Sequence, residues 1–136
     1  VVPPLEGFWW QDNVRGADYG NKDSFNWISV IRLPDFITKK DFEWAIEKAT
    51  RKKNLDCSEA EFLTIEEGLC VQIMHIGSFD NEPESVATMD AFLEENGYEN
   101  DINEKRLHHE IYMSDARKVV PEKWETVIRH PIKRKQ

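Results

Sequence analysis

The feature that most constrains this chain is an alternating stretch at residues 107–115, LHHEIYMSD. In a strand, successive side chains point to opposite faces, so His108, Glu110 and Tyr112 would share one face. A carboxylate beside a phenol on a strand face indicates more than packing. If that face lines a cavity, Glu110 is a buried acceptor or base with Tyr112 as its aromatic neighbour. We therefore expect a ligand pocket with one acidic residue at its floor; from the spacing alone, a solvated strand face is the alternative.

Composition restricts the class of partner. The 136 residues suit one domain with one core, and the formal net charge is −8. That charge argues against unassisted nucleic-acid binding, which requires Lys and Arg at phosphates, and favours a neutral or cationic aromatic ligand. No apolar run approaches the roughly 20 residues of a membrane helix, so no membrane partner is expected. With only Cys57 and Cys70 and no signal-peptide pattern, we expect a cytoplasmic protein with reduced thiols.

Alternation with a period of two predicts the strands. Polar turn residues at 11–23 separate the first two, which we expect to pair as a long-looped hairpin. A turn at Glu66-Glu67-Gly68 separates the next two, and Pro131 is expected to follow the end of the last. The expected strands are residues 5–10, 25–33, 61–65, 69–76, the stretch around Glu110, and 124–128.

Helical periodicity predicts two helices. Thr38 is a good N-cap with Asp41 in the capping-box position, and that helix runs to about Lys53. The second helix begins near Asn81 or Glu82. Antiparallel strands with helices on one side make an α+β sandwich. The expected buried stripe of the second helix is Val86, Met89, Phe92 and Leu93.

Several short motifs, in a fixed order, carry a family resemblance: LEGFWW (5–10), IRLPDF (31–36), GLCVQ (68–72) with HIG (75–77) and DNEP (80–83), and HEIYMSD (109–115). Together they resemble the GyrI-like family of small-molecule-binding domains, which also occur in multidrug-sensing transcription regulators. The resemblance implies two pseudo-symmetric strand-helix-strand-strand halves that face each other across a ligand groove.

The same resemblance implies how the halves divide the chain, which we expect to be a single domain over residues 1–136. Residues 1–33 resemble the last two strands of the first half, and residues 38–53 resemble the helix between the halves. Residues 60–136 resemble a complete second half. The opening strand and helix of the first half have no counterpart here, so we expect the start of that half to be missing from this chain.

The resemblance also implies a site and an activity. The family's pocket glutamate corresponds to Glu110 and its partner tyrosine to Tyr112. A stand-alone subgroup, which the paired Trp9-Trp10 resembles, hydrolyses cyclopropane-bearing DNA-alkylating natural products inside an aromatic cage. The first hypothesis is therefore a cyclopropyl hydrolase that detoxifies planar xenobiotics. The alternative is a non-catalytic domain that sequesters or senses aromatic, often cationic, ligands; a gyrase-interaction module is a third option.

Aromatic residues are the candidates for the cavity walls. Trp9, Trp10 and Trp27 either line the cavity or pack in the core. Strand alternation prevents Trp9 and Trp10 from both pointing into one cavity unless a bulge intervenes. Phe79 is either at the pocket rim or an anchor of its loop. Two further tryptophans are expected only to pack, Trp44 and Trp124.

The chemistry expected at the site depends on Glu110. Burial among aromatic rings should raise the pKa of this carboxyl group, which could then orient or deprotonate a water. The four histidines show no metal-ligand spacing, and neither a G-x-S-x-G motif nor a glycine-rich phosphate loop is present. We therefore expect no metal, no cofactor and no serine nucleophile.

Overall fold

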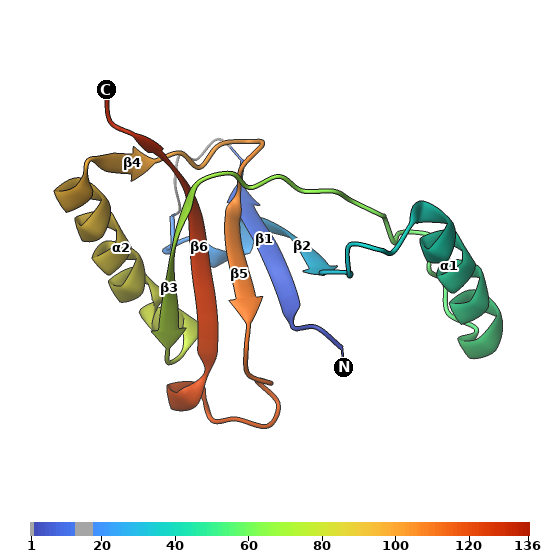
Figure 1. Cartoon of the computed structure of the whole chain (residues 1–136). Coiled ribbons are helices and arrows are strands. Elements are labelled where there is room, and N and C mark those ends of the chain that lie inside the picture. The colour runs from blue at the N-terminus through green and yellow to red at the C-terminus, as the bar shows by residue number, and fades with distance from the viewer. Residues whose placement is uncertain (1, 13–17) are drawn as a thin grey trace. The chain divides into compact units, whose positions relative to one another are not determined.

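A computed structural model describes residues 2–12 and 18–136, so part of the loop expected at 11–23 lies outside the described residues. The chain divides into two compact units, one formed by residues 33–66 and the other by the remaining residues on both sides of it. The larger unit contains the antiparallel sheet and one helix (Figure 1), which confirms the expected α+β class.

The main path of the sheet in the larger unit has five strands: β1 (Leu5–Gln11), β2 (Phe25–Ile31), β3 (Cys70–Ile76), β5 (His108–Tyr112) and β6 (Glu125–Arg134). They lie in the order β2-β1-β5-β6-β3, and every neighbouring pair is antiparallel. A short strand, β4 (Tyr98–Asn100), which alternation did not predict, pairs with the end of β6. The order joins strands from both ends of the chain, because β1 pairs with β5 (Figure 1).

The hairpin expected from the first two strands is confirmed. β1 and β2 pair continuously from Leu5 opposite Ile31 to Gln11 opposite Phe25. Because the register holds no bulge, neighbouring side chains of β1 alternate between the two faces of the sheet. Trp9 therefore lies on the face shared with His108, directly opposite it on β5, and Trp10 lies on the other face.

Helix α2 (Glu82–Asn96) covers one end of the sheet beside β3 and β4 (Figure 1). Pro83 lies in its first turn, and Gly97 ends it at φ 77°, a left-handed conformation that favours glycine. Met89 and Leu93 are buried as expected, but Phe92 is 53% exposed, so that part of the predicted stripe is wrong. Neighbouring residues of an α-helix are separated by more than a quarter-turn around its axis. Phe92 therefore points away from the sheet when Leu93 faces it.

Strand β6 continues through Pro131 instead of ending before it. The expectation was wrong because β5 pairs with β6 only as far as Arg129. Amide groups of a strand point alternately to its two neighbours, and the amide of Ile132 donates to Leu69 O on one side at 3.0 Å. The missing N–H of Pro131 therefore faces the other side, between the last residue of β6 that pairs with β5, Arg129, and the first that pairs with β4, Ile132.

The smaller unit contains helix α1 (Lys39–Lys53), which begins as predicted. Thr38 and Asp41 form the expected capping box. The strand predicted at residues 61–65 is wrong, because no strand is described there for it to pair with. Phe62 instead stacks on Phe42 of α1, with ring centroids 5.6 Å apart. Neither of the described helices combines the length and apolar character needed to cross a membrane.

Candidate functional site

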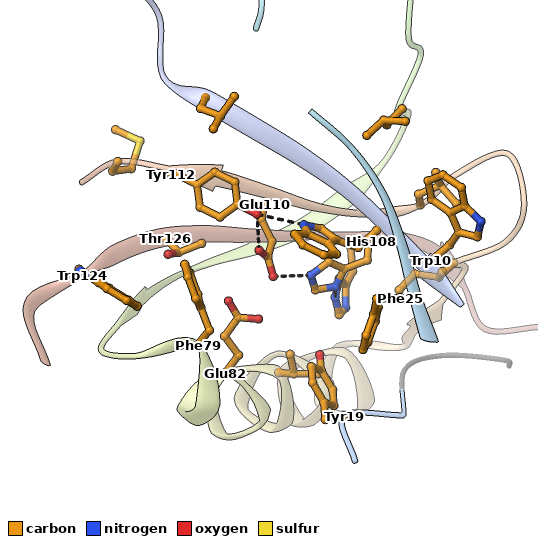
Figure 2. A pocket seen from close by; sticks show the side chains of 18 of the residues that line it. Trp10, Tyr19, Phe25, Phe79, Glu82, His108, Glu110, Tyr112, Trp124 and Thr126 are labelled. Atoms are coloured by element: carbon orange, nitrogen blue, oxygen red, sulfur yellow. Dashed lines mark hydrogen bonds and ion pairs between the residues drawn. The ribbon is translucent and has the colours of Figure 1, made fainter. Parts of the chain in front are cut away.

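The candidate site lies on the face of the sheet that α2 covers. Strand β5 projects His108, Glu110 and Tyr112 onto this face (Figure 2). Glu110 is 6% exposed. A carboxyl group removed from water to this extent needs compensating hydrogen bonds, and the arrangement of its neighbours supplies them.

Hydrogen-bond donors converge on Glu110. His108 Nε2 lies 2.8 Å from Glu110 Oε1, and the Tyr112 hydroxyl donates to Oε2, also at 2.8 Å (Figure 2). Trp9 Nε1 in turn donates to the Tyr112 oxygen at 3.0 Å. Burial and the charge of Glu110 raise the pKa of Tyr112, so this phenol stays protonated and donates. The indole, the phenol and the imidazole therefore act as one donor set for a single carboxylate.

The histidine pair extends this network away from the cavity. His130 Nε2 lies 2.7 Å from His108 Nδ1, and Asn100 Nδ2 lies 3.4 Å from His130 Nδ1. Burial, followed by the neighbouring His108, lowers the pKa of His130 to about 3, so His130 is neutral near pH 7. If the Asn100 amide donates to Nδ1, His130 donates from Nε2 to His108. His108 is then left to donate from Nε2 to Glu110. Each hydrogen bond in this row of side chains therefore donates in the direction of the carboxylate.

Glycine at position 7 makes room for these donors. Gly7 pairs directly with Glu110 across β1 and β5. A Cβ at this position would lie 2.8 Å from Trp9 Nε1 and 3.0 Å from the Tyr112 hydroxyl. Any other residue would displace the hydrogen bond that joins these two groups, so the site requires glycine here.

A second carboxyl group, Glu82, approaches Glu110 from the first turn of α2 (Figure 2). Glu82 is 4% exposed, and its Oε1 has no hydrogen-bond partner among residues 2–12 and 18–136. Burial, reinforced by the proximity of Glu110, raises the pKa of Glu82 to about 10. Glu82 therefore carries a proton at neutral pH.

The pKa of Glu110 is shifted in the opposite direction, below its ordinary value. Burial acts to raise its pKa, as expected from the sequence, but hydrogen bonds, led by the one from His108 and including that from Tyr112, outweigh burial. The net effect lowers the pKa of Glu110, so the expectation of a raised pKa was wrong. Two neighbouring carboxyl groups whose pKa values are pushed apart form an acid and base pair, here with Glu110 ionised and Glu82 protonated.

The same groups could also hold a divalent metal ion. One ligand atom each from Glu82, His108 and Glu110 lie within 4.8 Å of one another, and all three residues are buried. No metal was expected from the spacing of the histidines, and Glu82, which is distant from the other two residues in the sequence, was not a candidate ligand. The donor set of two carboxylates and an imidazole is suitable for several transition metals.

Aromatic rings surround the two carboxyl groups. Phe79 meets Tyr112 edge-on at 6.0 Å between centroids and lies 4.9 Å from Trp124. Across the cavity, Phe25 lies 6.2 Å from Trp9 and 6.3 Å from Tyr19 (Figure 2). Such walls are suited to stacking on a flat ligand.

The aromatic residues that the sequence suggested as cavity walls differ in how they lie relative to the cavity. Trp9 and Phe79 line the cavity near Glu110. Trp10 lies at its margin, with the ring directed away from Glu110 (Figure 2). Trp27 is 56% exposed, packs on Trp9 at 5.8 Å and is not among the described side chains that line the cavity. Trp124, expected only to pack, does line it.

Sequence reasoning missed Glu82, Tyr19 and the link from His108 to His130. For Glu82 a signal was available, because residues 82, 86, 89 and 93 recur on one helical face. An acidic residue at the head of an otherwise apolar stripe is buried and needs an explanation. For Tyr19 and His130 the sequence held no such signal, since their proximity to Glu110 depends on how distant segments pack.

The fold and this site define a class: an antiparallel α+β domain with a largely apolar cavity that holds a few convergent polar groups. Residues 1–133 match the family model of the GyrI-like small molecule binding domain. The chain belongs to that family, which confirms the resemblance found in the sequence motifs. It is therefore a small-molecule-binding domain.

Solved structures from Listeria innocua are similar to this chain. One is of an uncharacterized conserved protein, with a TM-score of 0.89 and 46% identity over 98% of this chain and 65% of that one. Two are described as a hydrolase, with TM-scores of 0.86 and 0.87 and 46% identity over 98% of this chain and 64% of each of those. This chain thus spans less than two thirds of the length of the structures that it matches. No curated protein sequence matches it.

Proposed function

We propose that this protein hydrolyses the cyclopropane ring of planar DNA-alkylating compounds, and so protects the cell that contains it. The observation that carries the proposal is the pair of buried carboxyl groups: Glu110 is held ionised by converging donors, and Glu82 is kept protonated. A hydrolase needs a group that takes a proton from water and a group that supplies one to the departing electron pair. The two glutamates meet both needs at neutral pH.

The reaction follows from those protonation states. Glu110 takes a proton from a water as the water oxygen bonds to the ring methylene and one carbon–carbon bond of the cyclopropane breaks. The bonding electrons pass through the conjugated system to the ketone oxygen, which receives the proton of Glu82. Transfer of a proton from Glu110 to Glu82 then restores both groups. General base and acid catalysis of this kind contributes roughly 10²–10⁴-fold each.

The cavity walls support a flat substrate. Phe79, Tyr112 and Trp9 surround the carboxyl groups and would stack on an extended aromatic skeleton. The structures named as a hydrolase from Listeria innocua are 46% identical to this chain, which favours an enzyme. A DNA-alkylating substrate would be intercepted in the cytoplasm, where we propose that the protein acts.

One observation favours the alternative, a non-catalytic domain that binds or sequesters aromatic cations. An ionised carboxylate enclosed by aromatic faces attracts a planar cation through charge and through the ring quadrupoles. Glu110 with Tyr112, Trp9 and Phe79 provides that environment. Binding of this kind needs no water attack and leaves the ligand intact.

Product formation separates the two functions. The full-length protein is incubated with a cyclopropane-bearing duocarmycin-type alkylator, and the product is followed by mass spectrometry. Catalytic gain of one water, lost in Glu110→Gln while ligand binding persists, is the expected result. Quenching of tryptophan fluorescence with the compound recovered intact would establish a binder and remove the hydrolase.

A further inference from the structure

The segment after β1 is tied to the strand by one buried side chain. Gln11 is 6% exposed, and its amide nitrogen donates to Ser24 Oγ at 2.8 Å and to Asp18 O at 3.0 Å. The amide of Asp18 donates back to Gln11 Oε1 at 2.7 Å. Residues 18–24 are thereby fixed against the end of β1 and cover one side of the cavity.

An ion pair attaches the same segment to the other side of the cavity. Lys22 pairs with Asp80, in the 3₁₀ turn Phe79–Asn81 that precedes α2. Both side chains are 71% exposed, so this pair contributes little to stability. It does connect the segment that carries Tyr19 to the turn that leads into Glu82.

Tyr19 directs a hydroxyl group from this segment into the cavity (Figure 2). The hydroxyl is fully buried, and no described residue forms a hydrogen bond with it. Burial, followed by nearby acidic groups, raises the pKa of Tyr19, so the phenol stays a donor. Leaving a buried donor unsatisfied is costly, and such groups in a cavity indicate a position where a ligand atom completes the hydrogen bond.

Glu82 Oε1 is the second buried side-chain oxygen without a partner among the described residues. It lines the same cavity as Tyr19, so two buried oxygen atoms without a described partner face one space. Tyr112 receives a hydrogen bond from Trp9, and His108 bonds to His130. Among residues 2–12 and 18–136, the fully buried side-chain oxygens that have no partner are those of Tyr19 and Glu82, and the Tyr19 hydroxyl can donate to a ligand atom that has lone pairs.

We propose that the Tyr19 hydroxyl, with Glu82 in the same cavity, hydrogen-bonds the carbonyl oxygen of the ligand, so that Tyr19 is a specificity-determining residue of this site. The inference rests on the hydrolase function proposed above and adds to it the side chain that recognises the conjugated ketone. As the carbon–carbon bond breaks, the electron pair moves onto this oxygen. The Tyr19 hydroxyl donates a hydrogen bond to the growing negative charge, and Glu82 transfers its proton there. Tyr19 itself keeps its proton throughout.

The test separates oxygen recognition from turnover by using two unreactive planar ligands. One is an aromatic ketone without a cyclopropane, and the other is the same skeleton with the carbonyl reduced to a methylene. Affinities are measured by tryptophan quenching for the wild type, Tyr19→Phe and a matched control, Tyr98→Phe. Tyr98 lies on β4 beside Arg134, outside the cavity lining.

We expect Tyr19→Phe to weaken binding of the ketone about tenfold, the usual value of one buried hydrogen bond, with the affinity for the methylene compound unchanged. Tyr98→Phe should alter neither affinity. Equal affinities of wild type and Tyr19→Phe for the ketone, or an equal loss for both ligands, would overturn the subsite. Because neither ligand can be hydrolysed, this result is independent of whether the alkylator is turned over.

Discussion

His108 and His109 are neighbours in the chain, yet they lie in opposite kinds of surroundings. On the face away from the cavity, His109 is 3% exposed and stacks on Phe8 at 4.1 Å. Its Nδ1 lies 2.5 Å from Glu67 Oε1, and its Nε2 lies 2.6 Å from Glu6 Oε1. Arg129 donates to the other oxygen of Glu67 at 2.8 Å.

This outer network is complete. Carboxylate oxygens of Glu6 and Glu67 lie within hydrogen-bond distance of both ring nitrogens of His109, and Arg129 pairs with the second oxygen of Glu67, so each of these groups has a partner. On the cavity face, by contrast, Glu110 has a full set of donors while Glu82 has an oxygen without a described partner. Buried polar and charged groups on one sheet therefore have two uses: where every atom is paired they support the structure, and where atoms are left unpaired they are available to a ligand.

The largest effect should come from removing the cavity carboxylate. Glu110→Gln keeps the shape but cannot accept a proton from water, so we expect kcat for alkylator hydrolysis to fall about 10³-fold. Glu6→Gln is the control from the outer face and should keep kcat within about threefold. Product formation is measured by mass spectrometry at equal concentrations of folded protein. Similar losses in both variants would mean that the two faces do not differ in this way.

A second substitution tests the outer network, the hydrogen-bonded groups around His109. His109→Gln removes the imidazole that bridges Glu6 and Glu67, so that Glu6 loses its partner in this network, and we expect the free energy of unfolding to fall by about 3 kcal/mol. Urea denaturation measures this loss, and turnover per folded molecule should be unchanged. An unaltered unfolding midpoint would show that the outer network contributes nothing to stability.

The protonation of Glu82 makes stability depend on pH. Its pKa is raised from 4.5 to about 10, so between these values the folded protein retains a proton that the unfolded chain releases. The free energy of unfolding therefore falls as pH rises, by up to about 1.4 kcal/mol per pH unit. In Glu82→Gln this contribution is absent. Urea denaturation from pH 7 to pH 9, above the titration of His130, should show a smaller decline for the variant; parallel declines would contradict a protonated Glu82.

The smallest effect is expected from substituting Trp9 and Trp27, two tryptophans that pack on each other. Trp9→Phe removes the hydrogen bond to the Tyr112 hydroxyl, and we expect kcat/KM to fall about tenfold. Trp27→Phe removes an exposed ring that does not line the cavity and should change kcat/KM less than about threefold. Equal losses would place both rings in the binding site.

Much of the local structure could be predicted from sequence because its causes are local. Alternation along β5 placed His108, Glu110 and Tyr112 on one face, and the capping box at Thr38 and Asp41 fixed the start of α1. Where the prediction depended on a partner, it was wrong: residues 61–65 have the composition of a strand, but no described strand pairs with them. Pro131 lies inside β6 because its neighbour β5 ends first.

What the sequence by itself determined is the pattern of each strand and helix, and with it the face on which Glu110 lies. Only the tertiary structure decided which groups meet that carboxylate. Glu82 comes from a helix, Tyr19 from a loop and Trp9 from the first strand, and the protonation of the two glutamates follows from their mutual approach and burial. Periodicity reports how a segment faces a core, whereas the pKa of a buried acid depends on atoms that only the packing of distant segments brings together.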